Sequence, residues 1–140
     1  MKNGFLLLLS IVFISLSSSC NAQSDKAAVS ESLSKSHVVE VYYFHFTQRC
    51  VTCQAIEDET KKAIEELFSS ALDEGEIAFI ALNLEEEDGE KMAKKLNVSG
   101  QTLLVVKDGK QMNLTNDGFL YARTNPEKLR ESLKKAIGEI

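Results

Sequence analysis

Two cysteines, Cys50 and Cys53, are separated by only two residues, in the order Cys-Val-Thr-Cys. Thiol–disulfide exchange needs an exposed thiolate of lowered pKa and a second thiol close enough to displace the bound partner. Two intervening residues supply that spacing. The same pair is also compatible with a structural disulfide or with half of a soft-metal site. The motif by itself therefore leaves three chemistries open.

The residues around this motif place it where a strand passes into a helix. Residues 38–46 form a nearly continuous β-branched and aromatic run, which is typical of a strand covered on both faces. After Cys53, apolar residues recur three and four apart, and this predicts an amphipathic helix that ends at Gly75. The N–H groups and dipole at the start of this helix favour a thiolate at Cys50, and Arg49 adds positive charge.

Strand patterns recur after this helix. The apolar run over residues 77–84 predicts a second buried strand. Residues 102–106 and 111–114 flank an Asp-Gly pair, which is a strong hairpin signal. Residues 118–122 are expected to prolong or to follow the second strand of that hairpin.

Two further segments carry helix patterns. Residues 85–97 predict a short charged helix, and the closing helix is expected to be capped by Asn125 and to begin at Pro126. The predicted order is β-α-β-α-β-β-α. We therefore expect the α/β class, with a central mixed sheet flanked by helices and the first three strands at the middle of the sheet.

The first twenty residues have the pattern of an export signal. Lys2 precedes an apolar run over residues 5–16, which is shorter than the ~20 residues of a membrane-spanning helix. Residues 17–20 resemble a bacterial lipoprotein box, in which Cys20 becomes the lipid-modified first residue, although the usual box begins with Leu rather than Ser. Ordinary signal cleavage before Gln23 is the alternative.

The chain is therefore expected to have three parts. Residues 1–19 are the signal peptide, and residues 20–36 mix Ser, Ala and charged residues in the manner of a flexible tether. Residues 37–140 form the folded domain. We expect an exported protein, periplasmic or attached to the outer membrane, and anchored by a lipid at Cys20.

The composition of the chain and the motifs that it lacks exclude several classes of function. The 140 residues carry 16 Lys and Arg against 21 Asp and Glu, a net charge of −5, whereas a nucleic-acid-binding surface needs clustered basic residues. Three cysteines are too few for a disulfide-stapled scaffold or a four-thiolate zinc site. No strand is followed by a Gly-x-Gly-x-x-Gly fingerprint for flavin or nicotinamide, and Gln54 after the motif excludes haem attachment.

A Cys-x-x-Cys pair at the first strand-to-helix junction of this β-α-β-α-β-β-α order resembles the thioredoxin-fold superfamily, over residues 38–140. The resemblance implies that Cys50 is the nucleophile and that Cys53, one turn into the helix and more buried, releases the product. It also implies a redox-active disulfide that needs no cofactor. More narrowly, residues 41–54 resemble short exported proteins of the ArsF family, called nitrophenyl-compound nitroreductase subunits.

The sequence departs from the thioredoxin pattern at two places. The family's cis-proline before the third strand is replaced by Gln101, and the chain's one proline is Pro126. In the family that proline adjoins the substrate peptide and shields the thiols from metal, so Gln101 puts peptide geometry in doubt and favours metal binding. The buried acid of many thioredoxins would fall near Phe44. His45 is the nearest titratable substitute, and is either a hydrogen-bonded histidine of the sheet, a proton acceptor or a third metal ligand.

Three hypotheses of function follow. The first is an extracytoplasmic thiol–disulfide oxidoreductase or thiol electron carrier, which exchanges with a protein thiol or disulfide and draws electrons from a membrane donor. The second is a soft-metal carrier that holds Cu(I) or Zn through Cys50, Cys53 and His45. The third, implied by the narrower resemblance, is an accessory subunit of a nitro- or arsenical-reduction system.

Overall fold

The computed structural model describes residues 39–140. The predicted signal peptide over residues 1–19, the tether over residues 20–36 and the lipidation site at Cys20 lie outside the described residues. Among the helices of residues 39–140, none is long and apolar enough to cross a membrane.

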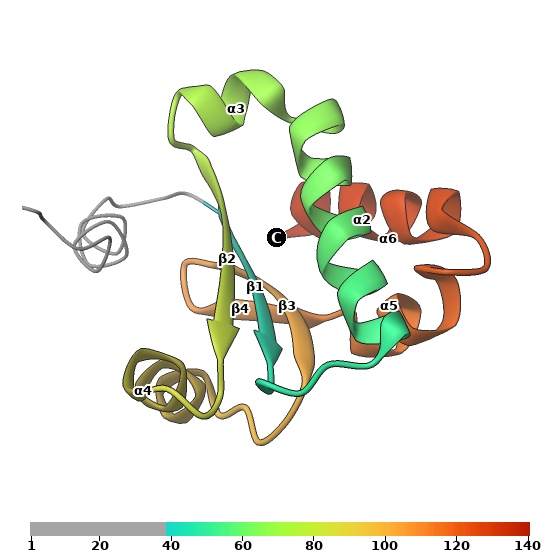
Figure 1. Ribbon diagram of the computed structural model, residues 1–140. Helices are drawn as coiled ribbons and strands as arrows, with labels where there is room; N and C mark the ends of the chain where they lie inside the picture. The colour runs from blue at the N-terminus through green and yellow to red at the C-terminus, as the bar shows by residue number, and fades with distance from the viewer. Residues whose placement is uncertain (1–38) are drawn as a thin grey trace, which may run out of the picture. The chain divides into compact units, whose positions relative to one another are not determined.

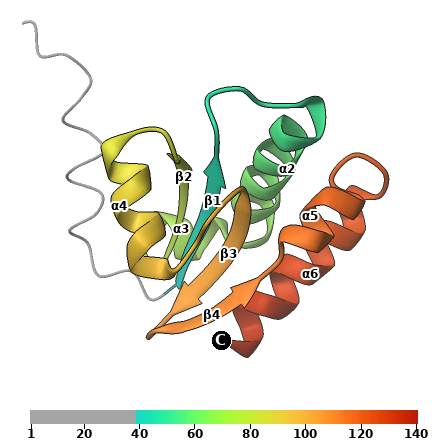
Figure 2. The ribbon, with the colours of Figure 1, turned by 90° about the horizontal axis from the view of Figure 1, so that it is seen from below.

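A four-stranded mixed sheet forms the centre of the domain, in the order β2-β1-β3-β4. β1 pairs in parallel with β2 and antiparallel with β3, and β3 pairs antiparallel with β4. The strands are β1 (Val39–His45), β2 (Ile77–Asn83), β3 (Thr102–Lys107) and β4 (Lys110–Asn113). The mixed sheet of the sequence analysis is confirmed, and Figure 2 shows its four strands between the helices.

Helices cover both faces of the sheet (Figures 1 and 2). One face packs against α2 and α6, and the other packs against α4. The helices are α2 (Val51–Leu67), α3 (Ser69–Asp73), α4 (Glu87–Leu96), α5 (Thr115–Tyr121) and α6 (Pro126–Glu139). The layered α/β arrangement is the one that the sequence predicts.

Alternate side chains of β1 enter two separate cores, as the period of a strand requires. Val41 and Tyr43 lie in the larger core with the apolar faces of α2 and α6. Tyr42 and Phe44 lie in the smaller core under α4. All four side chains are buried, so β1 is covered on both faces as predicted.

The prediction that the first three strands lie at the middle of the sheet is wrong for one of them. β1 and β3 have neighbours on both sides, but β2 is an edge strand among the described residues. Its sequence is apolar because both of its faces are partly covered by helices, and face burial cannot distinguish an edge strand from an interior one.

The helical segments differ from prediction at two places. The first helix stops at Phe68, whose backbone leaves the helical region at φ −134°, and α3 follows as a separate short helix. Residues 118–122, expected as strand, belong largely to the helix α5. The Asn113 side chain accepts a hydrogen bond from the Thr115 N–H, and Thr115 Oγ1 accepts one from the Leu103 N–H, so the turn after β4 starts a helix.

The turn and cap predictions hold in part. The Asp-Gly pair of the hairpin takes positive φ angles, 50° at Asp108 and 79° at Gly109, as a tight hairpin turn demands. Pro126 begins α6 as predicted, and Asn125 stands at the N-cap position. The Asn125 side chain, however, makes no capping hydrogen bond, and its carbonyl accepts from the Lys128 N–H instead.

Gly89 allows α4 to pack directly against the end of β2. A Cβ atom at this position would lie 1.8 Å from the Asn83 carbonyl oxygen. The nearest atoms to this Cβ all belong to the backbone of Asn83 and Leu84, so no side chain can move aside to make room. A helix carrying any other residue here has to shift away from the sheet.

We therefore expect Gly89→Ala to lower the free energy of unfolding by about 1–3 kcal/mol or more, as overpacking does. Gly138→Ala is the matched control, because a Cβ there meets nothing within 4 Å. Replacing a helical glycine without a clash stabilises by about 0.5–1 kcal/mol. Urea unfolding of the two variants measures the contrast, and equal effects would contradict the close approach.

Candidate active site

Cys50 and Cys53 form a disulfide at the start of α2, with Cα atoms 5.1 Å apart. Cys50 is the N-cap residue of α2, with extended backbone angles, and Cys53 lies in its first turn. The strand-to-helix junction predicted for the motif is confirmed. The two sulfurs differ in access, because Cys50 is exposed whereas Cys53 is 3% exposed.

Hydrogen bonds from the protein distinguish the two cysteines further. The Cys53 N–H, one of the N–H groups at the helix start, donates to the Cys50 sulfur over 3.2 Å. The Tyr43 hydroxyl donates to the Cys53 carbonyl oxygen over 2.9 Å. Burial raises the pKa of Tyr43 to about 12, against the opposing charge of Arg49, so the phenol keeps its proton and stays a donor.

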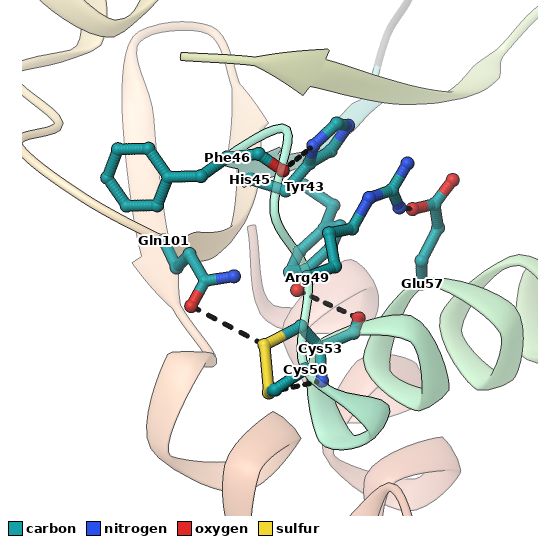
Figure 3. Close-up of polar contacts among 8 residues, drawn as sticks. All are labelled: Tyr43, His45, Phe46, Arg49, Cys50, Cys53, Glu57 and Gln101. Atoms are coloured by element: carbon teal, nitrogen blue, oxygen red, sulfur yellow. Dashed lines mark hydrogen bonds and ion pairs between the residues drawn. A yellow bond between two sulfur atoms is a disulfide. The ribbon is translucent and has the colours of Figure 1, made fainter. Parts of the chain in front are cut away.

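Arg49 does not face the motif as a free positive charge. Its guanidinium donates to the Glu57 carboxylate, two turns along α2, and both side chains are partly buried. Figure 3 shows the Arg49 side chain turned toward Glu57 and away from the disulfide. Glu57 therefore offsets much of the positive charge that the sequence analysis assigned to the neighbourhood of Cys50.

Gln101 lies opposite the motif, at the place where the sequence analysis put it. Its side-chain oxygen is 3.6 Å from the Cys53 sulfur (Figure 3). No peptide bond of residues 39–140 is cis, so the loop before β3 turns without one. Thr102 Oγ1 donates to the Gly100 carbonyl and tightens this turn. In the dithiol state the Cys53 S–H can donate to the Gln101 oxygen.

His45 takes the position of a hydrogen-bonded histidine of the sheet. It is 7% exposed, and its Nδ1 lies 3.0 Å from the Phe46 carbonyl oxygen, an acceptor that fits a ring protonated at Nδ1. In Figure 3 its ring points away from the disulfide. Within residues 39–140, no three His, Cys, Asp or Glu side chains come together as a possible metal site. Any metal held by Cys50 and Cys53 would need its remaining ligands from elsewhere.

The loop between β1 and the motif is held by residues that the sequence analysis did not single out. The Thr47 N–H donates to Glu85 over 2.8 Å, and the Asn83 side chain donates to Thr47 Oγ1 over 2.9 Å. Hydrogen bonds from Thr47, first from its side chain and then from its backbone, lower the pKa of Glu85. These partners are far apart in the chain, so no spacing in the sequence indicates them.

Neither a protein-family profile nor a curated protein matches the chain. Among solved structures, the oxidised form of thioredoxin O2 from Arabidopsis thaliana is similar to it, with a TM-score of 0.52 and 18% identity. The alignment covers 76% of this chain and 84% of that one. The chain has the thioredoxin fold.

Two further structures are similar with lower scores. Mitochondrial thioredoxin 3 from Saccharomyces cerevisiae, in its oxidised form, has a TM-score of 0.47 at 20% identity, covering 76% of this chain and 89% of that one. Fasciola hepatica thioredoxin has a TM-score of 0.45 at 24% identity, and the alignment covers 76% of this chain and 86% of that one. At these identities the likeness extends to the thioredoxin fold alone, and the narrower resemblance to the ArsF family stays a prediction.

The ion pair beside the motif predicts a measurable effect on Cys50. Glu57→Gln leaves the positive charge of Arg49 uncompensated, which favours the Cys50 thiolate. We expect the reduced protein to react roughly two- to fivefold faster with iodoacetamide at neutral pH, the effect of a partly exposed charge.

Glu65→Gln is the matched control for this measurement. Glu65 pairs with Lys61 on the same helix but outside the motif, so the Cys50 rate should not change. The enhancement at Glu57 should also shrink as salt is added, because partly exposed charges are screened. An unchanged rate in the Glu57 variant would show that Arg49 does not act on Cys50.

Proposed function

We propose that this protein is an extracytoplasmic thiol–disulfide oxidoreductase or thiol electron carrier that works through Cys50 and Cys53. The observation that carries the proposal is the asymmetry of the pair. One sulfur is exposed at a helix N-cap and receives an N–H donor, and the other is buried one turn later. Exchange chemistry needs this division between an attacking thiolate and a protected resolving thiol.

The proposed exchange takes place in two balanced steps. The Cys50 thiolate attacks one sulfur of a substrate disulfide, forms a mixed disulfide and releases the other substrate sulfur as a thiolate. The Cys53 thiolate then attacks the Cys50 sulfur, forms the disulfide of the described structure and releases the second substrate thiol. Two electrons pass to the substrate, and the reverse sequence oxidises a substrate dithiol.

Each neighbouring group has a part in these steps. The helix N-terminus stabilises Cys50 as the attacking and leaving thiolate. The Gln101 oxygen accepts from the Cys53 thiol and so holds it protonated and in place until the mixed disulfide forms. Tyr43 fixes the Cys53 backbone through its hydrogen bond. The chemistry uses the redox disulfide itself, and its partner is a protein thiol or disulfide, with a membrane protein as the electron donor.

The surface next to the motif offers a polar docking site for such a partner. A pocket of about 580 Å³ lies beside Cys50 and is lined by Thr47, Gln48, Arg49, Gln54, Glu57 and Asp58. Phe46 comes directly before this loop in the chain and Val51 directly after Cys50, and their side chains are 40% and 66% exposed. A partner peptide can therefore contact apolar and charged groups next to the reactive sulfur.

The reduction potential of the Cys50–Cys53 pair tests the proposal and gives the direction of electron flow. Equilibration with glutathione buffers of known ratio measures it. A reduction potential of about −270 mV indicates a protein that reduces its partner, and one of about −120 mV indicates a protein that oxidises it. A disulfide that stays closed at the lowest potentials used would identify a structural crosslink and overturn the proposal.

Substitution of each cysteine should separate the two roles. We expect Cys53→Ser to accumulate a mixed disulfide through Cys50, because the resolving thiol is missing, whereas Cys50→Ser should abolish both exchange and trapping. Limiting iodoacetamide should label Cys50 first in the reduced wild-type protein. Mass spectrometry of the labelled and trapped species is the measurement.

Two outcomes would count against these roles. Equal labelling of Cys50 and Cys53 would remove the asymmetry on which the mechanism depends. If both thiols stay protected until a chelator is added, the soft-metal carrier becomes the better hypothesis, with Cu(I) or Zn on the two sulfurs.

The location of the protein is proposed from its first twenty residues. We expect the mature chain to begin at a lipid-modified Cys20 and to be attached to the membrane. Mass spectrometry of the mature N-terminus and the effect of globomycin on processing are the measurements. A mature chain that begins at Gln23 and forms normally in the presence of globomycin would refute the lipid anchor.

A further inference from the structure

The edge strand β2 has the sequence of an interior strand. Its seven residues, Ile-Ala-Phe-Ile-Ala-Leu-Asn, contain no charge and no proline. Natural sheets protect their edges with short strands, charges, prolines or bulges, because an open edge pairs with other chains. The opposite edge, β4, follows this rule: it is four residues long, begins with a lysine and is largely exposed and polar.

Along this edge, the backbone of β2 has hydrogen-bonding groups that meet no partner within residues 39–140. The Val39 N–H donates to the Glu76 carbonyl and the Leu84 N–H to the His45 carbonyl, so even-numbered residues of β2 face β1. The N–H and C=O groups of the odd-numbered residues therefore point outward. Among the described residues, none bonds to the outward groups of Ile77, Phe79 and Ala81.

No described helix covers this row of groups. In Figure 1 the ribbon of β2 lies in front of β1, and no described element passes in front of it. Helices cover the two faces of the sheet, which explains the burial of Ile77 and Leu82, but they leave the edge open. The chemistry of such an edge fits one kind of partner, another extended strand.

We propose that β2 pairs antiparallel with β2 of a second copy of this chain, joining two sheets into one. The strand is complementary to itself. In a register centred on Ile80, each Phe79 lies opposite Ala81 of the other copy, and each Ala78 lies opposite Leu82. In these two pairs a large side chain meets a small one, one pair on each face, while Ile80 meets Ile80 of the other copy at the centre. The outward groups of Phe79 and Ala81 bond each other in pairs.

Charge sets the conditions under which the pairing forms. Acidic residues precede the strand at Glu74 and Glu76 and follow it at Glu85 and Glu86. An antiparallel pair brings the acidic start of one strand beside the acidic end of the other. The pairing is therefore stronger at 0.5 M salt than at low salt, because salt screens these exposed charges.

Photocrosslinking of the full-length chain tests this surface. A benzoylphenylalanine replaces Phe79 in cells that make two differently tagged copies, and the same probe at Gln111 on β4 is the matched control. The expected result is a crosslink between the two tags from position 79, mapped by mass spectrometry to residues 77–83 of the other copy. Position 111 gives none.

Substitutions on the edge complete the test. Ala81→Lys places a charge on the exposed edge and lowers the crosslink yield at least tenfold, whereas Gln111→Lys leaves it unchanged. If the lysine variant loses its circular dichroism spectrum, Ala81→Pro replaces it, because the N–H that proline removes points away from β1. When the photocrosslinking is repeated in lysates of these cells, the wild-type yield is higher at 0.5 M salt than at low salt.

Three results would overturn the proposal. One is the absence of a crosslink from position 79 in the wild-type background. Another is a crosslink from position 79 to residues 1–38 of the same copy, or to a different protein. The third is a crosslink between copies that survives in the folded Ala81 variant.

Discussion

Strand β1 is hydrogen-bonded on both sides and buried on both faces, and the other elements are arranged around it. β2 and β3 flank it, and its alternate side chains supply Tyr43 to one core and Tyr42 and Phe44 to the other. Because the strand ends at His45 and only residues 46–50 separate it from α2, the position of β1 determines where the helix N-terminus lies. The Cys50–Cys53 pair thus follows a strand that is held on both sides and covered on both faces.

The two sulfurs have opposite surroundings although they lie in one turn of helix. Cys50 is at the solvent-exposed cap and receives an N–H donor, whereas Cys53 is buried and has an oxygen acceptor, Gln101, next to it. A hydrogen-bond donor next to a cysteine sulfur favours the thiolate, and a hydrogen-bond acceptor favours the protonated thiol. The helix start and the loop before β3 therefore act in the same direction, and neither needs the charge of Arg49, which Glu57 offsets.

Within residues 39–140, the same layered packing that buries β1 leaves the backbone of β2 unpaired on its outer side. Helices can cover the faces of a sheet, but only a strand can satisfy the groups along its edge. β2 and β4 are both edge strands of the described sheet, but their sequences are very different. That contrast, rather than exposure alone, distinguishes a strand suited to pairing from one protected against it.

Local patterns in the sequence predicted much of this protein. The runs of apolar residues predicted β1, β2 and β3, the helical spacing predicted α2, α4 and α6, and the Asp-Gly pair predicted the hairpin turn. The strand and helix patterns on either side of the Cys-x-x-Cys motif placed the cysteine pair at a helix start. These features depend on the backbone conformations that each residue type prefers and on the spacing of apolar residues. Both act over a few residues and are therefore visible in the sequence itself.

Tertiary structure decided the rest. That residues 115–121 form a helix rather than a strand depends on hydrogen bonds from the turn and on close packing, since Gly118 approaches Ile56 of α2. The pairing of Arg49 with Glu57, the bond from Tyr43 to the Cys53 carbonyl and the links from Thr47 to Asn83 and Glu85 join groups at spacings that carry no signal. The position of β2 at an edge is decided in the same way. Apolar periodicity reports which faces are buried, but hydrogen-bonded neighbours in a sheet are chosen by the whole fold.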